Sequence, residues 1–124
     1  MRTVDTSAWI EWLAESATGD ALAEEWPDLD RCVVPTIVQL ELVKWLSREM
    51  SEDVTDQVTA HTRKCVVVDL TTDIALVAAE QSGSHRLSTA DAVIYATALV
   101  TGSELITCDA HFKGLPHVLY FAKT

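Results

Sequence analysis

Two aspartates stand where an expected strand ends and an expected helix begins. Asp5 follows the apolar run Arg2–Val4, and Asp109 comes two residues after the run Glu104–Thr107. In an open parallel sheet, ligands bind beyond the carboxyl ends of the strands, so both acids occupy the position of a ligand site. An aspartate at such a junction can also cap the helix that follows, which is worth about 1 kcal/mol. Each residue alone fits that structural role.

Glu41 lies on the apolar face of an expected helix. Ile37 and Val38 precede it by one helical turn, and Trp45 follows it by one turn. A carboxylate on such a face loses hydration and needs a cation, a hydrogen-bond donor or a metal as its partner. A salt bridge to Lys44, three residues on, is the alternative to a functional role.

Asp91 presents the same conflict at the start of another helix. Ile94, Tyr95 and Ala98 follow it on the same helix face, which directs it toward the core. Its place three residues after Ser88 also suits a capping box, in which the acid merely closes the first turn. From the sequence, the two interpretations of Asp91 weigh equally.

Together, these four acids come from two strand ends and two helices that must pack on one sheet, so their carboxylates can converge at one rim. Like charges that close need a counterion, and Mg²⁺ or Mn²⁺ is the natural one because both prefer hard oxygen ligands. Such an ion activates water and stabilises charge on a phosphoryl oxygen, so attack on a phosphodiester suits the site.

Short apolar runs alternate with longer helical segments along the chain, which predicts an α/β fold: a short parallel sheet of about five strands with helices on both faces. The expected strands are Arg2–Val4, Cys32–Val34, Cys65–Asp69, Glu104–Thr107 and Val118–Phe121. The expected helices are Ser7–Glu15, Asp20–Trp26, Ile37–Met50, Glu52–Thr62, Thr72–Ser82 and Thr89–Thr101. Capping boxes are predicted at Thr36–Gln39 and Ser88–Asp91.

Composition narrows the classes of protein further. The 124 residues include 19 acidic and 9 basic ones, for a formal charge of −10, and 48% of them are hydrophobic. We expect one compact domain over residues 1–124, without the broad basic face of a non-specific nucleic-acid binder. The three cysteines suggest neither disulfides nor a paired zinc motif. With no expected signal peptide or membrane span, the sequence favours a cytoplasmic protein.

The four acids and their surroundings resemble the PIN-domain ribonucleases, and within them the VapC-type toxins of toxin–antitoxin pairs. The resemblance spans nearly the whole chain, through VDTSAWIEWL, TIVQLELVKWL, VVVDLTTDIALVAAE and LSTADAVIYATALVTGSELITCDAHF. The last segment is the specific one, with D-A-x-I-x-A-T-A, a glycine, a short strand and T-x-D-x-H-F in this order. A three-layer PIN-like fold is therefore expected.

The resemblance implies a metal-dependent endoribonuclease with Mg²⁺, for which Mn²⁺ can substitute. Asp5 and Asp91 would be its principal metal ligands, and Glu41 and Asp109 would complete the acidic pocket directly or through water. Thr107 would help orient a carboxylate or water. It also implies an RNA substrate, such as tRNA or another structured RNA, a homodimer, and a cognate antitoxin whose tail fills the acidic groove.

Substrate contacts are less clearly marked. Besides Thr6, the candidates are basic residues near the acids: Lys44, Arg48, Arg86 and Lys113. Ordinary solvated charge is the alternative for each of these basic residues. Cys108 departs from the polar or charged residue more common there in the family, which bears on substrate contact rather than on the metal.

Three other interpretations remain open. A receiver-type phospho-acceptor domain shares the length, acidity and use of Mg²⁺, but it needs an acidic pair after the first strand, where this chain has Asp5–Thr6, and only Asp69 partly fits its phosphorylation site. A PIN-like module without catalysis would not need all four acids. A zinc site would be drawn from Cys108, Asp109, His111 and His117, but these residues lack the paired spacing of zinc ligands.

The tryptophans, at positions 9, 12, 26 and 45, favour core or dimer-interface packing over a binding platform.

Overall fold

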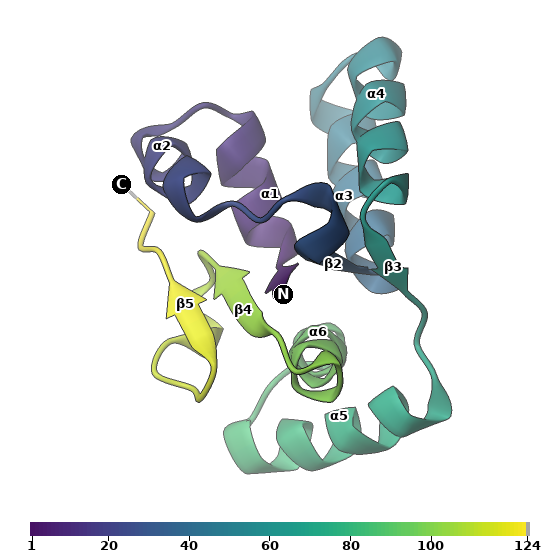
Figure 1. The fold of residues 1–124 in the computed structure, drawn as a ribbon, viewed down its shortest axis with the longest axis vertical. Coiled ribbons are helices and arrows are strands. Elements are labelled where there is room, and N and C mark those ends of the chain that lie inside the picture. Colours follow the sequence, from purple (N-terminus) through teal and green to yellow (C-terminus); the bar gives the residue numbers. More distant parts are fainter. Residues whose placement is uncertain (124) are drawn as a thin grey trace.

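The structure is a computed structural model that describes residues 1–123 (Figure 1). Its strands are β1 (Arg2–Val4), β2 (Cys32–Pro35), β3 (Val66–Val68), β4 (Glu104–Thr107) and β5 (Val118–Tyr120). Its α-helices are α1 (Thr6–Leu13), α2 (Ala17–Glu25), α3 (Thr36–Glu49), α4 (Glu52–Arg63), α5 (Thr72–His85) and α6 (Thr89–Thr101). Two short 3₁₀ helices are η1 (Leu29–Arg31) and η2 (Ala110–Phe112).

All five strands pair in parallel in one sheet, in the order β3-β2-β1-β4-β5. Helices α1 to α4 lie on one side of the sheet, and α5 and α6 lie on the other (Figure 1). This arrangement confirms the predicted three-layer α/β fold. A receiver domain has the strand order 2-1-3-4-5 instead, so the topology excludes the receiver interpretation.

The direction of winding reverses between β1 and β4. The chain runs outward from β1 through β2 to β3, then returns to place β4 on the other side of β1. Arg2, Thr3 and Val4 of β1 pair with Glu104, Leu105 and Ile106 of β4. A crevice at the carboxyl ends of two such strands is the usual ligand site of a doubly wound sheet. The residues that follow β1 and β4 therefore lie at this crevice.

Helix α6 is the most deeply buried helix of the described chain. Every residue from Ala92 to Ala98 is buried, and small alanine side chains let the helix pack closely on the sheet. Ser88 caps its start by accepting a hydrogen bond from the backbone NH of Asp91, as predicted. Gly102, with φ of 66°, ends it in the left-handed conformation that glycine adopts without strain. Because α6 runs antiparallel to β4, its first turn lies at the carboxyl edge of the sheet.

Large side chains fill the core on both sides of the sheet. Trp9, Tyr95 and Phe112 are each almost completely buried. Trp12 and Trp26 stack with their ring centroids 4.3 Å apart and pack partly buried against the core. Core packing of the tryptophans is therefore confirmed for Trp9, and Trp12, Trp26 and Trp45 share it in part.

The start of α3 differs from the prediction. Pro35 occupies the N-cap position, without a side-chain hydrogen bond, and Thr36 is already inside the helix. The amide of Gln39 donates to the hydroxyl of Thr62 on α4, at 3.2 Å, instead of closing a capping box. The predicted capping box at Thr36–Gln39 is therefore wrong, because the tertiary contact between α3 and α4 takes the glutamine side chain.

Most other helix and strand boundaries agree with the prediction within about two residues, and α2 and α5 each extend three residues farther at one end. Helix α2 packs so closely on α1 that a Cβ at Gly19 would collide with the carbonyl oxygen of Glu11. Within residues 1–123, no helix is both long and apolar enough to cross a membrane.

Candidate active site at the crevice between β1 and β4

Asp5 is buried at the centre of the crevice, with a side chain held by two hydroxyl groups. Ser7 Oγ donates to Asp5 Oδ2 at 2.7 Å, and Thr107 Oγ1 donates to the same oxygen at 2.8 Å. Asp5 is the N-cap residue of α1, yet its side chain makes no capping hydrogen bond. The capping role considered from the sequence is therefore not the role of this carboxylate.

The same two hydroxyls also bind the loop after β4, and Ser7 thereby connects this loop to the first turn of α1. Ser7 Oγ accepts a hydrogen bond from the backbone NH of Cys108 at 2.9 Å, and Thr107 Oγ1 accepts one from Asp109 at 3.0 Å. Since both hydroxyl protons point to Asp5, each hydroxyl acts once as donor and once as acceptor. This network fixes Asp5 relative to Asp109.

Burial raises the pKa of Asp5 to about 6. The hydrogen bonds from Ser7 and Thr107 oppose this rise, and the negative charges of Asp91 and Asp109 add to it. These electrostatic effects place three carboxylates within interaction range of one another, although they come from three separate segments. Asp5 thus borders the same crevice as Asp109, to which the Thr107 hydroxyl links it, although Asp5 lies outside the close group that Asp91 and Asp109 form.

Asp91 and Asp109 form a tight group with His111. One ligand atom from each of the three lies within 4.8 Å of the others, and in residues 1–123 this is the group suited to a metal ion. His111 Nδ1 is 3.4 Å from Asp91 Oδ2 and 3.2 Å from Asp109 Oδ1. Burial raises the pKa of Asp91, and the charge of Asp109 contributes to the rise. Asp109 also caps η2 by accepting from the backbone NH of His111, so its predicted capping role is confirmed.

Glu41 is half-buried on α3 and accepts a hydrogen bond from Thr6 Oγ1 at 2.7 Å. Thr6 directly follows Asp5, so this bond ties α3 to the start of α1 beside the crevice. Within residues 1–123, Glu41 forms no ion pair with Lys44, which is exposed. The salt bridge considered from the sequence is therefore absent from the described chain, and Glu41 does not belong to the tight group of Asp91, Asp109 and His111.

Of the basic residues predicted to contact a substrate, Lys113 lies close to the site. It follows η2 directly, and its Nζ is 5.6 Å from the centre of the Tyr120 ring. Arg48 pairs with Glu49 on the exposed side of α3, at 3.1 Å. Arg86 is exposed at the end of α5, in the left-handed conformation with φ of 55°. The structure therefore does not gather Lys44, Arg48 and Arg86 around the carboxylates.

Two residues of the site escaped the sequence reasoning. Ser7 lies two residues after Asp5, in the D-T-S sequence, which was the signal that could have indicated it. Its role in positioning Asp5 also depends on the backbone NH of Cys108, which is distant in the sequence. His111 was considered from the sequence as a member of a zinc set, and its position beside Asp91 was not predicted. The zinc set of Cys108, Asp109, His111 and His117 is not found in residues 1–123, where Asp91 joins Asp109 and His111 instead.

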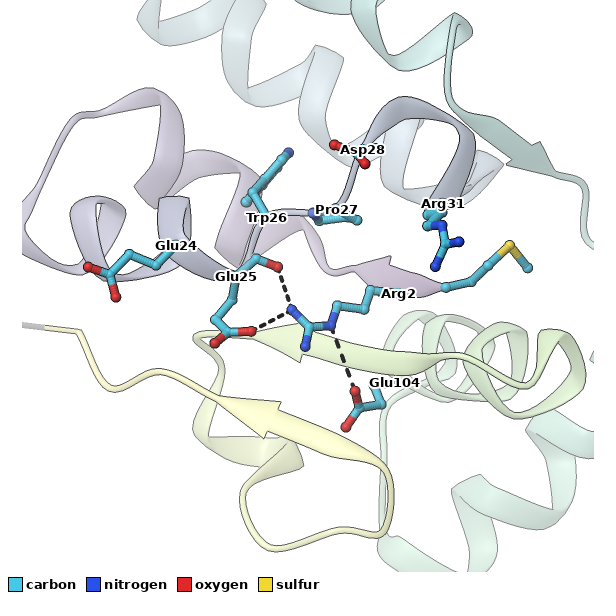
Figure 2. Close-up of a pocket in the computed structure, with 9 residues that line it drawn as sticks. Arg2, Glu24, Glu25, Trp26, Pro27, Asp28, Arg31 and Glu104 are labelled. Carbon is cyan, nitrogen blue, oxygen red and sulfur yellow. Dashed lines mark hydrogen bonds and ion pairs between the residues drawn. The ribbon is translucent and has the colours of Figure 1, made fainter.

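A second pocket, of about 350 Å³, lies at the opposite edge of the sheet, where the strands begin (Figure 2). Arg2 Nη1 donates there to the carboxylate of Glu25 at 2.7 Å and to its backbone oxygen at 2.6 Å. Arg2 Nε is 3.7 Å from Glu104 Oε1. These contacts satisfy the charge of Arg2 and join α2 to β1 and β4, so we assign this pocket a structural role.

A doubly wound parallel sheet with three carboxylates at its switch point defines an α/β protein with an acidic ligand site. The model of the PIN domain family matches residues 3–118, and the chain belongs to this family. The resemblance to PIN domains noted from the sequence is thereby confirmed. A comparison with curated proteins gave no match.

Solved structures share the fold over almost the full length of the chain. A toxin–antitoxin complex from Klebsiella pneumoniae matches with a TM-score of 0.83 and 22% identity, covering 96% of both chains. VapC20 from Mycobacterium tuberculosis, a toxin that cleaves the sarcin–ricin loop, matches with a TM-score of 0.73 and 20% identity, covering 100% of this chain and 98% of that one. VapBC-1 from Haemophilus influenzae matches with a TM-score of 0.72, 17% identity and coverages of 98% and 96%. At these identities, the likeness establishes the shared fold.

Proposed function

We propose that this protein is a divalent-metal-dependent endoribonuclease and the toxin of a toxin–antitoxin pair. The observation that carries the proposal is the close group of Asp91, Asp109 and His111 at the crevice between β1 and β4, where the Thr107 hydroxyl links Asp109 to the buried Asp5. Membership of the PIN family and the shared fold with VapC-type toxins support it. We place its action in the cytoplasm, where it would meet RNA.

The donor set at the crevice suits Mg²⁺ or Mn²⁺. Asp91 and Asp109 offer oxygens close to one another. Burial is the main reason for the raised pKa of Asp5, and the negative charges of Asp91 and Asp109, which a divalent cation would offset, add to the rise. Asp5, Glu41, Asp91 and Asp109 would hold the ion directly or through water. When bound, a divalent ion supplies positive charge to the phosphoryl oxygens and lowers the pKa of water.

The chain itself contributes orientation. Ser7 and Thr107 hold one oxygen of Asp5, which leaves its second oxygen, Oδ1, for the centre of the site. Thr6 fixes Glu41 in the same way on the α3 side. Ordered carboxylates of this kind reduce the reorganisation needed during cleavage of a phosphodiester bond.

The first experiment is calorimetric titration with Mn²⁺, combined with cleavage assays on tRNA and other structured RNA. The wild type is expected to bind Mn²⁺ saturably and to cut RNA, and Asp91→Asn is expected to lose both while remaining folded. Asp56→Asn, on the exposed side of α4, is the matched control and should behave as wild type. If Asp91→Asn cuts RNA at the wild-type rate, the assignment of the site is wrong.

A retained fold with metal binding and no cleavage would favour the second possibility, a PIN-like module that only binds a partner. In that case, Mn²⁺ titration of the wild type would succeed while every RNA stays intact. The presence of all the acids expected from the sequence, three of them gathered at one crevice, argues for the nuclease.

We further propose that a small antitoxin encoded beside this protein binds and inhibits it, and that the toxin forms a homodimer. A basic side chain of the antitoxin would neutralise the cluster of Asp5, Asp91 and Asp109. Expression of the native operon with a tag on this chain tests the proposal. Co-purification of a small partner, and a mass of two copies by light scattering, are the expected results; isolation of this chain alone would contradict the toxin role but not the nuclease.

A further inference from the structure

A pocket of about 440 Å³ continues from the acidic crevice toward β5. Ser7 and Asp109 of the crevice form one end of its lining, and Tyr120 and Lys123 form the other. This pocket has the size of a small-ligand site, and Asp109 is the carboxylate of the crevice that lines it. A molecule that reacts at the crevice can therefore extend into it.

Strand pairing explains why Tyr120 borders the crevice. Tyr120 of β5 is the register partner of Thr107 of β4, and the backbone NH of Phe121 donates to the carbonyl oxygen of Thr107 at 2.9 Å. Partners in a parallel pair direct their side chains to the same face of the sheet. Since the Thr107 hydroxyl faces Asp5, the half-buried ring of Tyr120 lies beside it on that face.

Two lysines accompany this ring. Lys113 Nζ lies 5.6 Å from the centre of the Tyr120 ring, and Lys123 lines the pocket itself. Burial raises the pKa of the Cys108 thiol to about 11, and the nearby positive charge of Lys123 opposes this rise. Neither lysine has a carboxylate within ion-pair distance in residues 1–123, so both ammonium groups are free to meet a phosphate.

We propose that this pocket binds the nucleotide next to the scissile phosphate, with its base stacked on Tyr120 and its phosphates near Lys113 and Lys123. The inference rests on the proposed ribonuclease function and names the side chains that would hold one unpaired nucleotide beside the cut. Only an unpaired base can leave its neighbours and stack on an aromatic side chain. Lys113 is exposed and on a flexible stem, so it can move from the ring to a phosphate when a base arrives.

The charge of the molecule supports this assignment. With a formal charge of −10, most of the surface repels RNA, so a phosphate chain needs a local path with unpaired cations. The pocket provides that path beside Asp109, one of the carboxylates that would hold the metal. Stacking is also tolerant of base identity, so the pocket favours an unpaired nucleotide rather than one particular base.

The test uses a single-stranded 2′-O-methyl RNA 12-mer that carries 2-aminopurine, whose fluorescence is quenched when it stacks. In the presence of Mg²⁺, wild type and Tyr120→Phe are expected to bind this RNA and to quench its fluorescence. Under the same conditions, Tyr120→Leu should bind the RNA about 10-fold to 100-fold more weakly and should not quench its fluorescence. Lys123→Gln should also weaken binding, and Lys64→Gln, at the end of α4, is the matched control. The same RNA in a duplex should bind more weakly than the single strand.

The outcomes separate this inference from the proposed function. Tyr120→Leu and Tyr120→Phe could bind the RNA with the same affinity and quench its fluorescence equally, while the wild type binds Mn²⁺ and cuts RNA. That result would overturn the inference and leave the proposed nuclease function intact. If the wild type neither binds Mn²⁺ nor cuts RNA, the proposed function fails, and the inference fails with it. Unchanged circular dichroism and Mn²⁺ affinity of Tyr120→Leu would exclude misfolding as the reason for weaker RNA binding.

Discussion

Asp5 is a carboxylate kept in a position that disfavours its charge. It is only 3% exposed, and burial together with two neighbouring carboxylates raises its pKa to about 6. The hydroxyls of Ser7 and Thr107 recover part of this cost by donating to one of its oxygens. A buried carboxylate whose charge does not stabilise the folded state at neutral pH is typical of a functional site.

The raised pKa of Asp5 makes the stability of the metal-free protein depend on pH. Its pKa is 3.8 in the unfolded reference and about 6 in the folded state, so the folded state keeps a proton that the unfolded chain has released between these values. The contribution of Asp5 is therefore fully present below about pH 4 and lost as the pH rises to about 6. It amounts to about 3 kcal/mol.

Urea unfolding of wild type and Asp5→Asn in EDTA, at several pH values from 4 to 7, measures this effect. The free energy of unfolding of the variant, relative to wild type, should increase across that range, because Asn carries no charge. Mn²⁺ at pH 7 should stabilise the wild type and leave the variant unchanged. Parallel pH profiles for the two proteins in EDTA would show that Asp5 titrates normally.

Ser7→Ala tests the hydroxyl network around Asp5. The substitution removes one donor to Asp5 Oδ2 and leaves the backbone NH of Cys108 without its acceptor, so the free energy of unfolding should fall by about 1–3 kcal/mol. The pKa of Asp5 should rise further, because the bond from Ser7 lowers it. Carboxyl NMR titration measures that pKa. Ser16→Ala, which removes the cap of α2, should lower stability without moving the pKa of Asp5.

At the scale of residues, the sequence predicts the carboxylates better than the groups that position them. Asp5 and Asp109 follow apolar runs, and such runs are visible without a structure. The partners of Ser7 and Glu41 depend on which loops meet in space: Ser7 meets Cys108, and Glu41 meets Thr6 rather than Lys44. The spacing of residues along the chain does not predict those contacts.

Among the elements, α6 decides where Asp91 lies. Its buried stretch Ala92–Ala98 fixes the helix against the sheet, and the Ser88 cap fixes its first turn. The apolar period and the capping pair were both readable from the sequence, so this helix matches the prediction. For α3 the cap prediction failed, because Gln39 contacts Thr62 on another helix, and a local motif does not include such a partner.

A comparison of two N-caps separates the role of α6 in stability from its role in the site. Ser88 Oγ accepts from Asp91 NH at 3.3 Å, and Ser51 Oγ accepts from Val54 NH at 3.2 Å at the start of α4. Ser88→Ala and Ser51→Ala should each lower the free energy of unfolding by about 1 kcal/mol. Only Ser88→Ala should weaken Mn²⁺ binding, because Ser88 caps the first turn of α6, which carries Asp91. Equal Mn²⁺ affinities of both variants in calorimetry would contradict this role of α6.

On the scale of the whole molecule, the order of the strands creates the site. The sequence predicts parallel strands and the number of strands, but not that β4 returns beside β1. That return places Thr107 and Asp109 against Asp5 and leaves β5 as the next strand. It also places Tyr120 beside Thr107, a contact that lies outside any local pattern.

The charge of the whole molecule predicts an unusual salt dependence for RNA binding. A protein with a charge of −10 whose proposed RNA path offers two lysines should neutralise about two phosphates, so the slope of log K against log salt should be near −1.4. Lys113→Gln and Lys123→Gln should each reduce that slope by about 0.7, because each removes one phosphate contact. Anisotropy of a single-stranded RNA at fixed Mg²⁺ and rising KCl measures it. A slope unchanged in the double variant would mean that RNA follows another face of the protein.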